Sequence, residues 1–162
     1  MTKLHYLFII GFIVCALSAT AQKNKDVIKI TSCEDQGILK KADSLKALLA
    51  DSGFVVMRQA MVSMESEYEL PVIVPLNAGT WYKIIFIGDI NSRLYELRVY
   101  DYDENQVIYK KHLWGDVDGN IISFSYVPKF TEFHMIKPVQ VNKNKKKKKL
   151  CGYIMLLQKT GK

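Results

Sequence analysis

Residues 93–100 read Arg-Leu-Tyr-Glu-Leu-Arg-Val-Tyr, a stretch in which large apolar and charged side chains mostly alternate. Successive side chains of an extended chain point to opposite faces, so one face of this stretch is apolar and the other is charged. The apolar face carries Tyr95, Leu97 and Val99. Residues 121–126, Ile-Ile-Ser-Phe-Ser-Tyr, repeat the alternation against two serines. Strands with one buried and one solvated face are typical of antiparallel sheets.

Outward from these two stretches, the same period of two recurs along most of the chain. The segments predicted to be strands are 54–64, 68–76, 80–87, 93–100, 106–111, 121–127, 131–137 and 150–158. Turn-forming Asn, Asp and Gly residues separate them, and no second helix is expected between them, which argues against a parallel sheet. The pattern therefore predicts a mainly β fold, an antiparallel jelly-roll-like β-sandwich of about eight strands. An up-and-down barrel has the same periodicity and remains the alternative.

A single helix is predicted over residues 34–50, ahead of the strands. Ile38, Ala42, Leu45 and Leu49 recur at helical spacing and form one apolar stripe. We expect this stripe to pack on the sandwich, covering an open end or edge of a sheet. The strand at 68–76 contains two prolines, which cannot donate to a ladder, and it is therefore expected at an edge.

The first residues have the three regions of an export signal. Lys3 precedes an apolar run over residues 4–17, and Ala19 and Ala21 supply the small residues of a cleavage site. We predict a secretory signal peptide over 1–21 and an exported protein that is periplasmic, on the outer surface or secreted. An uncleaved anchor is the alternative, although the run is short for a bilayer span of about 20 residues. The predicted organisation is a signal peptide at 1–21, an N-terminal segment at 22–33, a helix at 34–52 and a β-sandwich domain at 53–162.

Export changes how the cysteines are interpreted. Cys15 lies within the predicted signal, which leaves Cys33 and Cys151 in the mature chain. An even pair in an oxidising compartment is a disulfide candidate, which would tie the N-terminal segment to the last strand. Two unpaired thiols are the alternative, because sequence does not give the distance between them.

The formal net charge is +7, and its excess comes from one segment, a lysine-rich loop at 142–149. The lysines of that loop are Lys143, Lys145, Lys146, Lys147, Lys148 and Lys149. Like charges in a row repel and prefer solvent, so a solvated connection is one interpretation. Contact with an anionic envelope component is the functional one. Nucleic acid is not expected, because the chain has few arginines and the lysine run contains no aromatic residue.

The sequence contains no recognisable catalytic motif and predicts no catalytic residue, metal or cofactor. His112 and His134 are expected to be surface or half-buried strand histidines, and a nucleophilic pair of Cys151 with either would need an oxyanion hole. Two loops alternate oxygen-bearing residues, Asp101, Asp103 and Asn105 in the first and Asp116, Asp118 and Asn120 in the second. Such residues supply calcium ligands but are also ordinary turn residues, and the sequence leaves the choice open.

Several aromatic residues lie on or beside the predicted strands and are candidates for stacking on sugar rings. They are Trp81, Tyr82, Tyr95, Tyr100, Tyr102, Tyr109 and Trp114. Aromatic residues in strands more often belong to the core or to cross-strand pairs.

Three stretches appear in a recurrent order. They are Pro-Leu-Asn-Ala-Gly-Thr-Trp-Tyr at 75–82, Leu-Arg-Val-Tyr-Asp-Tyr-Asp-Glu-Asn-Gln-Val at 97–107 and Asp-Gly-Asn-Ile-Ile-Ser-Phe-Ser-Tyr-Val-Pro at 118–128. Over residues 70–158 the chain resembles the pre-peptidase C-terminal domain family, with Val99 and Tyr126 departing from its pattern. The resemblance implies a jelly-roll sandwich that serves secreted or surface proteins as an accessory module, some members binding calcium or sugars.

These observations favour an exported, non-enzymatic binding or accessory protein of the cell envelope that contacts anionic surfaces through the lysine-rich loop. A carbohydrate-binding or calcium-dependent glycan-binding module is the alternative, and a hydrolase is the third hypothesis.

Overall fold

The computed structural model describes residues 33–113, 115–144 and 149–160. The elements are α2 (Gln36–Asp51), β1 (Phe54–Glu65), β2 (Val72–Leu76), β3 (Tyr82–Gly88), β4 (Ser92–Tyr100), β5 (Gln106–His112), α3 (Gly115–Asp118), β6 (Ile121–Tyr126), β7 (Glu132–Asn142) and β8 (Lys149–Lys159). The described helices include none long and apolar enough to cross a membrane. The predicted signal peptide lies outside the described residues.

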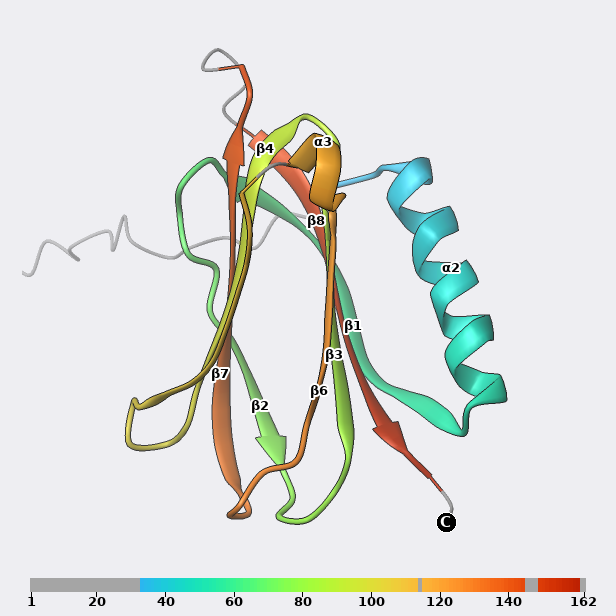
Figure 1. The fold of residues 1–162 in the computed structure, drawn as a ribbon, viewed down its shortest axis with the longest axis vertical. Helices are drawn as coiled ribbons and strands as arrows, with labels where there is room; N and C mark the ends of the chain where they lie inside the picture. The colour runs from blue at the N-terminus through green and yellow to red at the C-terminus, as the bar shows by residue number, and fades with distance from the viewer. Residues whose placement is uncertain (1–32, 114, 145–148, 161–162) are drawn as a thin grey trace, which may run out of the picture.

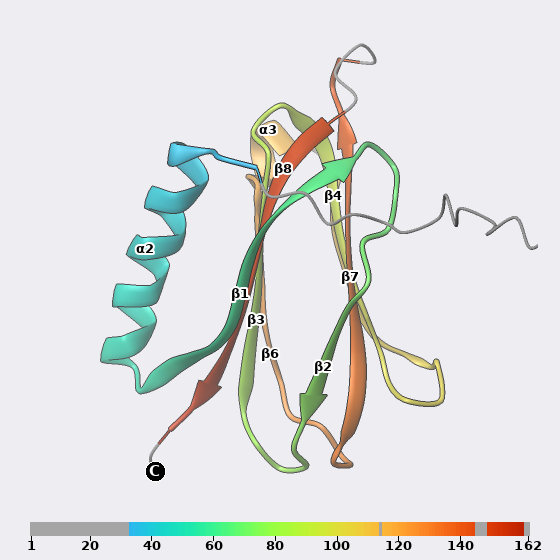
Figure 2. The same ribbon diagram turned by 180° about the vertical axis from the view of Figure 1, so that it is seen from behind.

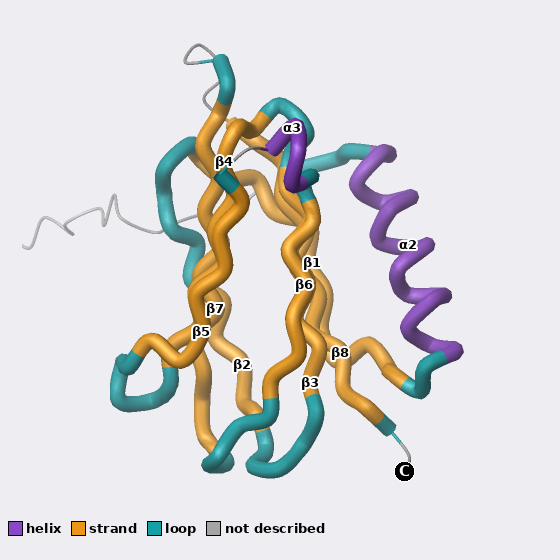
Figure 3. Tube along the Cα trace, viewed as in Figure 1, coloured by secondary structure: helices purple, strands orange, loops and turns teal. Residues whose placement is uncertain are grey.

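The strands form two antiparallel sheets that stack as layers (Figures 1 and 3). Sheet A has the order β1-β8-β3-β6 and sheet B the order β2-β7-β4-β5. The first strand pairs with the last, the second with the seventh, the third with the sixth and the fourth with the fifth. This nesting is that of one long hairpin rolled into two layers, the jelly-roll arrangement. The predicted jelly-roll-like sandwich is confirmed, and because the strands divide between two sheets the barrel alternative is wrong.

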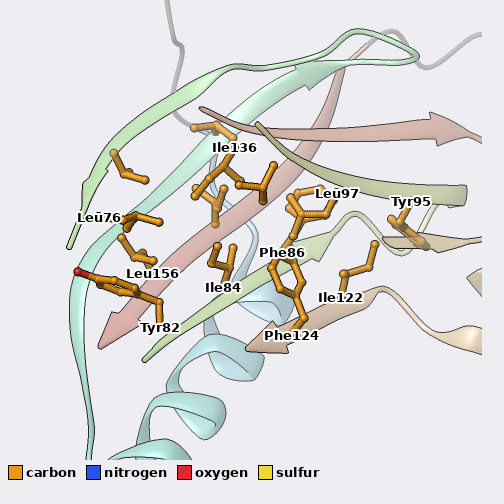
Figure 4. Packing of buried hydrophobic residues seen from close by; sticks show 14 of the residues in the cluster. Leu76, Tyr82, Ile84, Phe86, Tyr95, Leu97, Ile122, Phe124, Ile136 and Leu156 are labelled. Atoms are coloured by element: carbon orange, nitrogen blue, oxygen red, sulfur yellow. The ribbon is translucent and has the colours of Figure 1, made fainter. Parts of the chain in front are cut away.

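The main core lies between the sheets (Figure 4). Tyr95, Leu97 and Val99 point inward from β4, as their alternation predicts, and Ile122 and Phe124 do the same from β6. Their charged and serine neighbours lie on the outer faces. The period of two in these strands therefore records which sheet face is buried.

Helix α2 covers the outer face of sheet A rather than an end or edge, which corrects the sequence expectation (Figure 1). The side chain of Asp35 caps the helix by accepting a hydrogen bond from the Ile38 nitrogen at 3.0 Å. Ile38 and Ala42 are buried against the second apolar cluster, which comprises Phe54, Ile85, Ile87, Tyr153, Met155 and Leu157 from the outer face of sheet A. Because β3 and β8 are apolar on both faces, this sheet needs a cover, and the helix stripe supplies it.

Strand β2 is an edge strand, as the prolines predict, but it begins only at Val72. Strand β7, in contrast, continues past Pro138, beyond the end expected from sequence. The Pro138 carbonyl accepts a hydrogen bond from the Leu70 nitrogen, which lies just before β2. Because the nitrogen and carbonyl of one strand residue point to the same side, the Pro138 nitrogen also faces this region, where β2 has not yet begun. The missing N–H therefore interrupts no ladder. One helical turn, α3, stands where only a loop was expected.

Candidate functional site

The lysine-rich loop joins β7 to β8 and thus connects the two sheets at one end of the sandwich (Figure 1). Lys143 and Lys149, at its two ends, are exposed. Lys145, Lys146, Lys147 and Lys148 lie outside the described residues. The chain therefore enters and leaves the lysine run at solvent-facing positions, on strands that belong to different layers.

A buried polar side chain organises the strands below this loop. Gln140 of β7 is fully buried, and its Oε1 accepts from the Asp89 nitrogen at 2.9 Å and from the Ser92 hydroxyl at 3.2 Å. Its Nε2 donates to the carbonyl of Cys151 in β8 at 3.1 Å. One amide thus links β7, the β3–β4 turn and β8, and so holds both sheets together at the base of the loop. Buried amides need such partners, because an unpaired one is costly.

Hydrogen bonds also connect the β3–β4 turn to the residues at and beside the lysine-rich loop. The Asp89 carboxylate accepts from Asn91 nitrogens at 2.9 and 2.7 Å and from the Cys151 nitrogen at 3.2 Å. The Lys143 nitrogen then donates to the Asn91 carbonyl at 2.9 Å. A Cβ at Gly88 would lie 2.4 Å from the Tyr95 ring, so only glycine lets this ring pack on the turn. The first residue of the lysine run is therefore held by a rigid support.

The predicted disulfide between Cys33 and Cys151 is present, with Cα atoms 5.9 Å apart. It joins the segment preceding α2 to β8 next to the lysine-rich loop. Because the Cys151 sulfur is bonded to Cys33, it is not a thiolate nucleophile, which removes the cysteine–histidine pair considered from sequence.

The two histidines lie apart from each other. His134 is buried, and its Nε2 lies 3.0 Å from the Tyr126 hydroxyl. The Nδ1 of His112 lies 3.1 Å from the Gly119 carbonyl oxygen. Each histidine is thus engaged with its own local neighbours. His112 is half-buried, as expected, whereas the full burial of His134 corrects the sequence expectation.

The acidic loops make turn contacts. The Asp101 carboxylate accepts from the Asn105 backbone and side-chain nitrogens at 2.8 and 3.2 Å, closing its hairpin. Asn120 is buried, and its side chain accepts from Lys41 Nζ at 2.7 Å and donates to the Gly88 carbonyl. Within the described ranges no three His, Cys, Asp or Glu residues converge as they would around a metal ion. The side chain of Asp116 lies outside the described part.

The aromatic candidates separate into three groups. Tyr82 and Tyr95 are buried in the core, and Trp81 packs edge-on against Phe54 with ring centroids 5.8 Å apart. Tyr100, Tyr102 and Tyr109 belong to or follow the strands of sheet B, whereas Trp114 lies outside the described residues. Among the described candidates, Trp81 and the sheet B tyrosines therefore remain partly exposed and could stack on a ligand.

The outer face of sheet B carries an ion-pair cluster that alternation alone did not reveal, and we call it the sheet B cluster. It consists of Glu69, Glu96, Arg98, Tyr100, Tyr109, Lys111 and Lys137. Glu96 is nearly buried and binds Arg98, and it also pairs with Lys111 Nζ at 3.1 Å. Burial acts to raise the pKa of the Glu96 carboxyl, but the hydrogen bonds from Arg98 and Lys111 outweigh it and hold that pKa below its ordinary value. Arg98 and Lys137 also lie over the rings of Tyr109 and Tyr100.

No protein-family model matches the sequence, and no curated protein matches it. Among solved structures, a "Glycosylation Associate Protein (Gap123) complex from Streptococcus agalactiae" aligns with 67% of this chain at 13% identity and a TM-score of 0.37. The aligned part is 40% of that chain.

Proposed function

We propose that this protein is an exported, non-enzymatic binding or accessory protein of the cell envelope that contacts an anionic surface through its lysine-rich loop. The supporting observation is the placement of the loop. It joins the two sheets at one end of the sandwich, and the buried Gln140 holds the strands at its base.

Several further observations agree with the proposal. The Cys33–Cys151 disulfide fits an oxidising compartment, and the sequence of residues 1–21 has the regions of an export signal. An accessory role is also what the resemblance to the pre-peptidase C-terminal domain family implies. The acidic Glu65 stands opposite Lys149 in register and offsets part of the charge at one end of the run. The central lysines therefore carry most of the expected attraction.

The test compares two triple variants with equal loss of charge. In the first, Lys145, Lys146 and Lys147 become Gln. Each lysine near an anionic surface contributes about 1 kcal/mol, so this variant should bind lipopolysaccharide-containing vesicles on the order of 100-fold more weakly. The mature protein is titrated in a sedimentation assay, with neutral phosphatidylcholine vesicles as the blank.

The control variant replaces the exposed lysines Lys40, Lys110 and Lys129, which lie on α2, on β5 and after β6. It should keep nearly all of the affinity, because its lost charges lie on elements other than the connection between β7 and β8. Equal weakening by both variants would mean that only net charge matters. Undiminished binding by the loop variant would reject the proposed contact.

A second candidate function is glycan binding on the outer face of sheet B. Tyr109 is 45% exposed, and its hydroxyl donates to Glu96 at 3.2 Å, so the ring is held in place beside charged hydrogen-bonding groups. Oriented aromatic rings next to polar groups suit sugar rings. A glycan array probed with the mature protein tests this function. Signals abolished by Tyr109→Ala would support it, and an array without signal would reject it.

A further inference from the structure

One long side of the sandwich is open, because β1 and β2 are the edge strands of their sheets on that side (Figure 2). A groove of about 440 Å³ lies between them. It is lined by Met57, Arg58, Gln59, Ala60, Val72, Val74, Ile136, Ile154 and Leu156. Such a volume is within the range of small-molecule sites, roughly 300–1,000 Å³, which are also mostly apolar. Of the lining residues, Val74, Ile136, Ile154 and Leu156 are buried core residues, whereas Met57, Arg58, Gln59 and Ala60 are exposed. The groove thus lies where the inter-sheet core meets the open side of the sandwich.

A single cation stands among these apolar residues. Arg58 is opposite Leu156 in register, so both side chains lie on the inner face of sheet A. Arg58 is exposed and joins none of the ion pairs of the described residues. Gln59 is on the other face, where it accepts a hydrogen bond from the Tyr153 hydroxyl. Arg58 is therefore the one charged side chain that lines the groove, and its guanidinium attracts an anion.

Both edges of the groove are unsuited to receiving another strand. The register of β1 shifts between Val56 and Arg58, and such a bulge interrupts ladder hydrogen bonds. Strand β2 contains Pro75 and follows Pro71, and prolines on an edge remove donors. An inward-pointing charge such as Arg58 also opposes edge pairing. These features favour an occupant that needs no backbone hydrogen bonds.

We propose that this groove binds a single-chain anionic amphiphile of the fatty-acid type. The tail lies along Val74, Ile154 and Leu156, and the carboxylate binds the Arg58 guanidinium. The guanidinium fork matches a carboxylate with two parallel hydrogen bonds. This site is on the long side of the sandwich and is independent of the lysine-rich loop, so failure of one proposal leaves the other standing.

The test uses dodecanoate and the uncharged dodecanol, each titrated calorimetrically into the mature protein below the micellar range. Dodecanoate should bind with one-to-one stoichiometry and more tightly than dodecanol. Arg58→Gln should weaken dodecanoate binding roughly 10- to 100-fold, as expected for a lost charge-assisted hydrogen bond, and leave dodecanol binding unchanged. Arg93→Gln makes the same charge change at an exposed position of β4 and should have no effect.

A steric variant provides the second arm. Ala60→Phe fills the groove and should abolish binding of both amphiphiles, whereas Ala78→Phe, in the exposed turn after β2, should not. Circular dichroism and the urea midpoint confirm that each variant folds. Absence of dodecanoate binding, equal affinity for acid and alcohol, or undiminished binding by Ala60→Phe would overturn the proposal.

Two further results would assign the groove to another occupant and would also overturn the proposal. Dodecanoate binding that appears only after Ile28→Asp would show that the chain's own segment 27–30, Val-Ile-Lys-Ile, fills it. A dimer in sedimentation velocity that Ala60→Phe converts to monomer would show that a second copy does.

Discussion

The outer face of sheet A is apolar and lies under α2, whereas the outer face of sheet B carries the sheet B cluster and no described helix covers it. Both sheets belong to the same rolled hairpin, so topology alone does not set this difference. It comes from the side chains at outward positions, which are Ile85 and Ile87 in β3 but Glu96 and Arg98 in β4. A sheet with two apolar faces requires a cover, and a sheet with paired charges on one face does not.

The disulfide should give the largest effect, since it ties the segment before α2 to sheet A and has no counterpart among the described residues of sheet B. Its cysteines are 118 positions apart. In the chain-entropy model, closing a loop of this size stabilises by about 4 to 5 kcal/mol. Cys33→Ser with Cys151→Ser should lower the free energy of unfolding by about that amount in urea denaturation. An unchanged urea midpoint would show that the disulfide does not contribute to the stability of the fold.

Truncating one isoleucine on the outer face of each sheet compares the two faces directly. Ile85 is fully buried under α2, and its truncation to Ala should cost about 2 to 5 kcal/mol. Ile73, on the outer side of β2, is 58% exposed, and Ile73→Ala should change stability by less than about 0.5 kcal/mol. Chemical denaturation of both variants measures the difference. Similar losses would mean that the two faces are equally covered.

Most strands could be predicted from the sequence, because burying one face of a strand makes apolar and polar residues alternate along it. The sequence did not predict where α2 lies. An apolar stripe predicts that a helix packs against another part of the fold, but it does not identify which surface. The continuous apolar stretch in β3 was the available signal, since it requires burial on both faces. With it, the outer face of sheet A would have been the expected docking surface.

The candidate site was predicted only in part. The lysine run and the cysteine pair are visible in the sequence, whereas Gln140 falls beyond the predicted strand 131–137 and carries no signal of a buried role. Its role depends on Asp89 and Cys151, which are distant in the chain and meet only in the folded state. Glu96 likewise fits a solvated strand face, although its two cationic partners make it nearly buried.

A smaller effect is expected from the helix cap. Asp35→Ala removes the acceptor of the Ile38 nitrogen and should cost about 1 kcal/mol. Asp51→Ala, at the last residue of α2, is the matched control, because an acid at a helix C-terminus is not favoured by the helix dipole. Thermal unfolding should separate the two variants. A cap variant as stable as the control would indicate that packing on sheet A alone holds the helix.

The smallest effect concerns the uncovered face and depends on pH. The folded-state pKa of Glu96 is lowered, so its ionised form stabilises the protein above the unfolded-state pKa of about 4.3. This contribution is lost as pH falls from there through the lower folded-state pKa. Glu96→Gln should therefore flatten the decline in stability over that window. Parallel acid denaturation curves for Glu96→Gln and the unaltered protein would contradict the account.

The surface proposed to contact an anionic envelope component is neither outer face but the end of the sandwich where the lysine-rich loop joins β7 to β8. The most direct measurement is the affinity of the mature protein for lipopolysaccharide-containing vesicles as a function of salt. The Debye screening length shortens from about 30 Å at 0.01 M ionic strength to about 8 Å at 0.15 M, so the affinity for the vesicles should fall steeply across this range. Binding that is independent of salt, or equal on neutral vesicles, would contradict the proposed electrostatic contact.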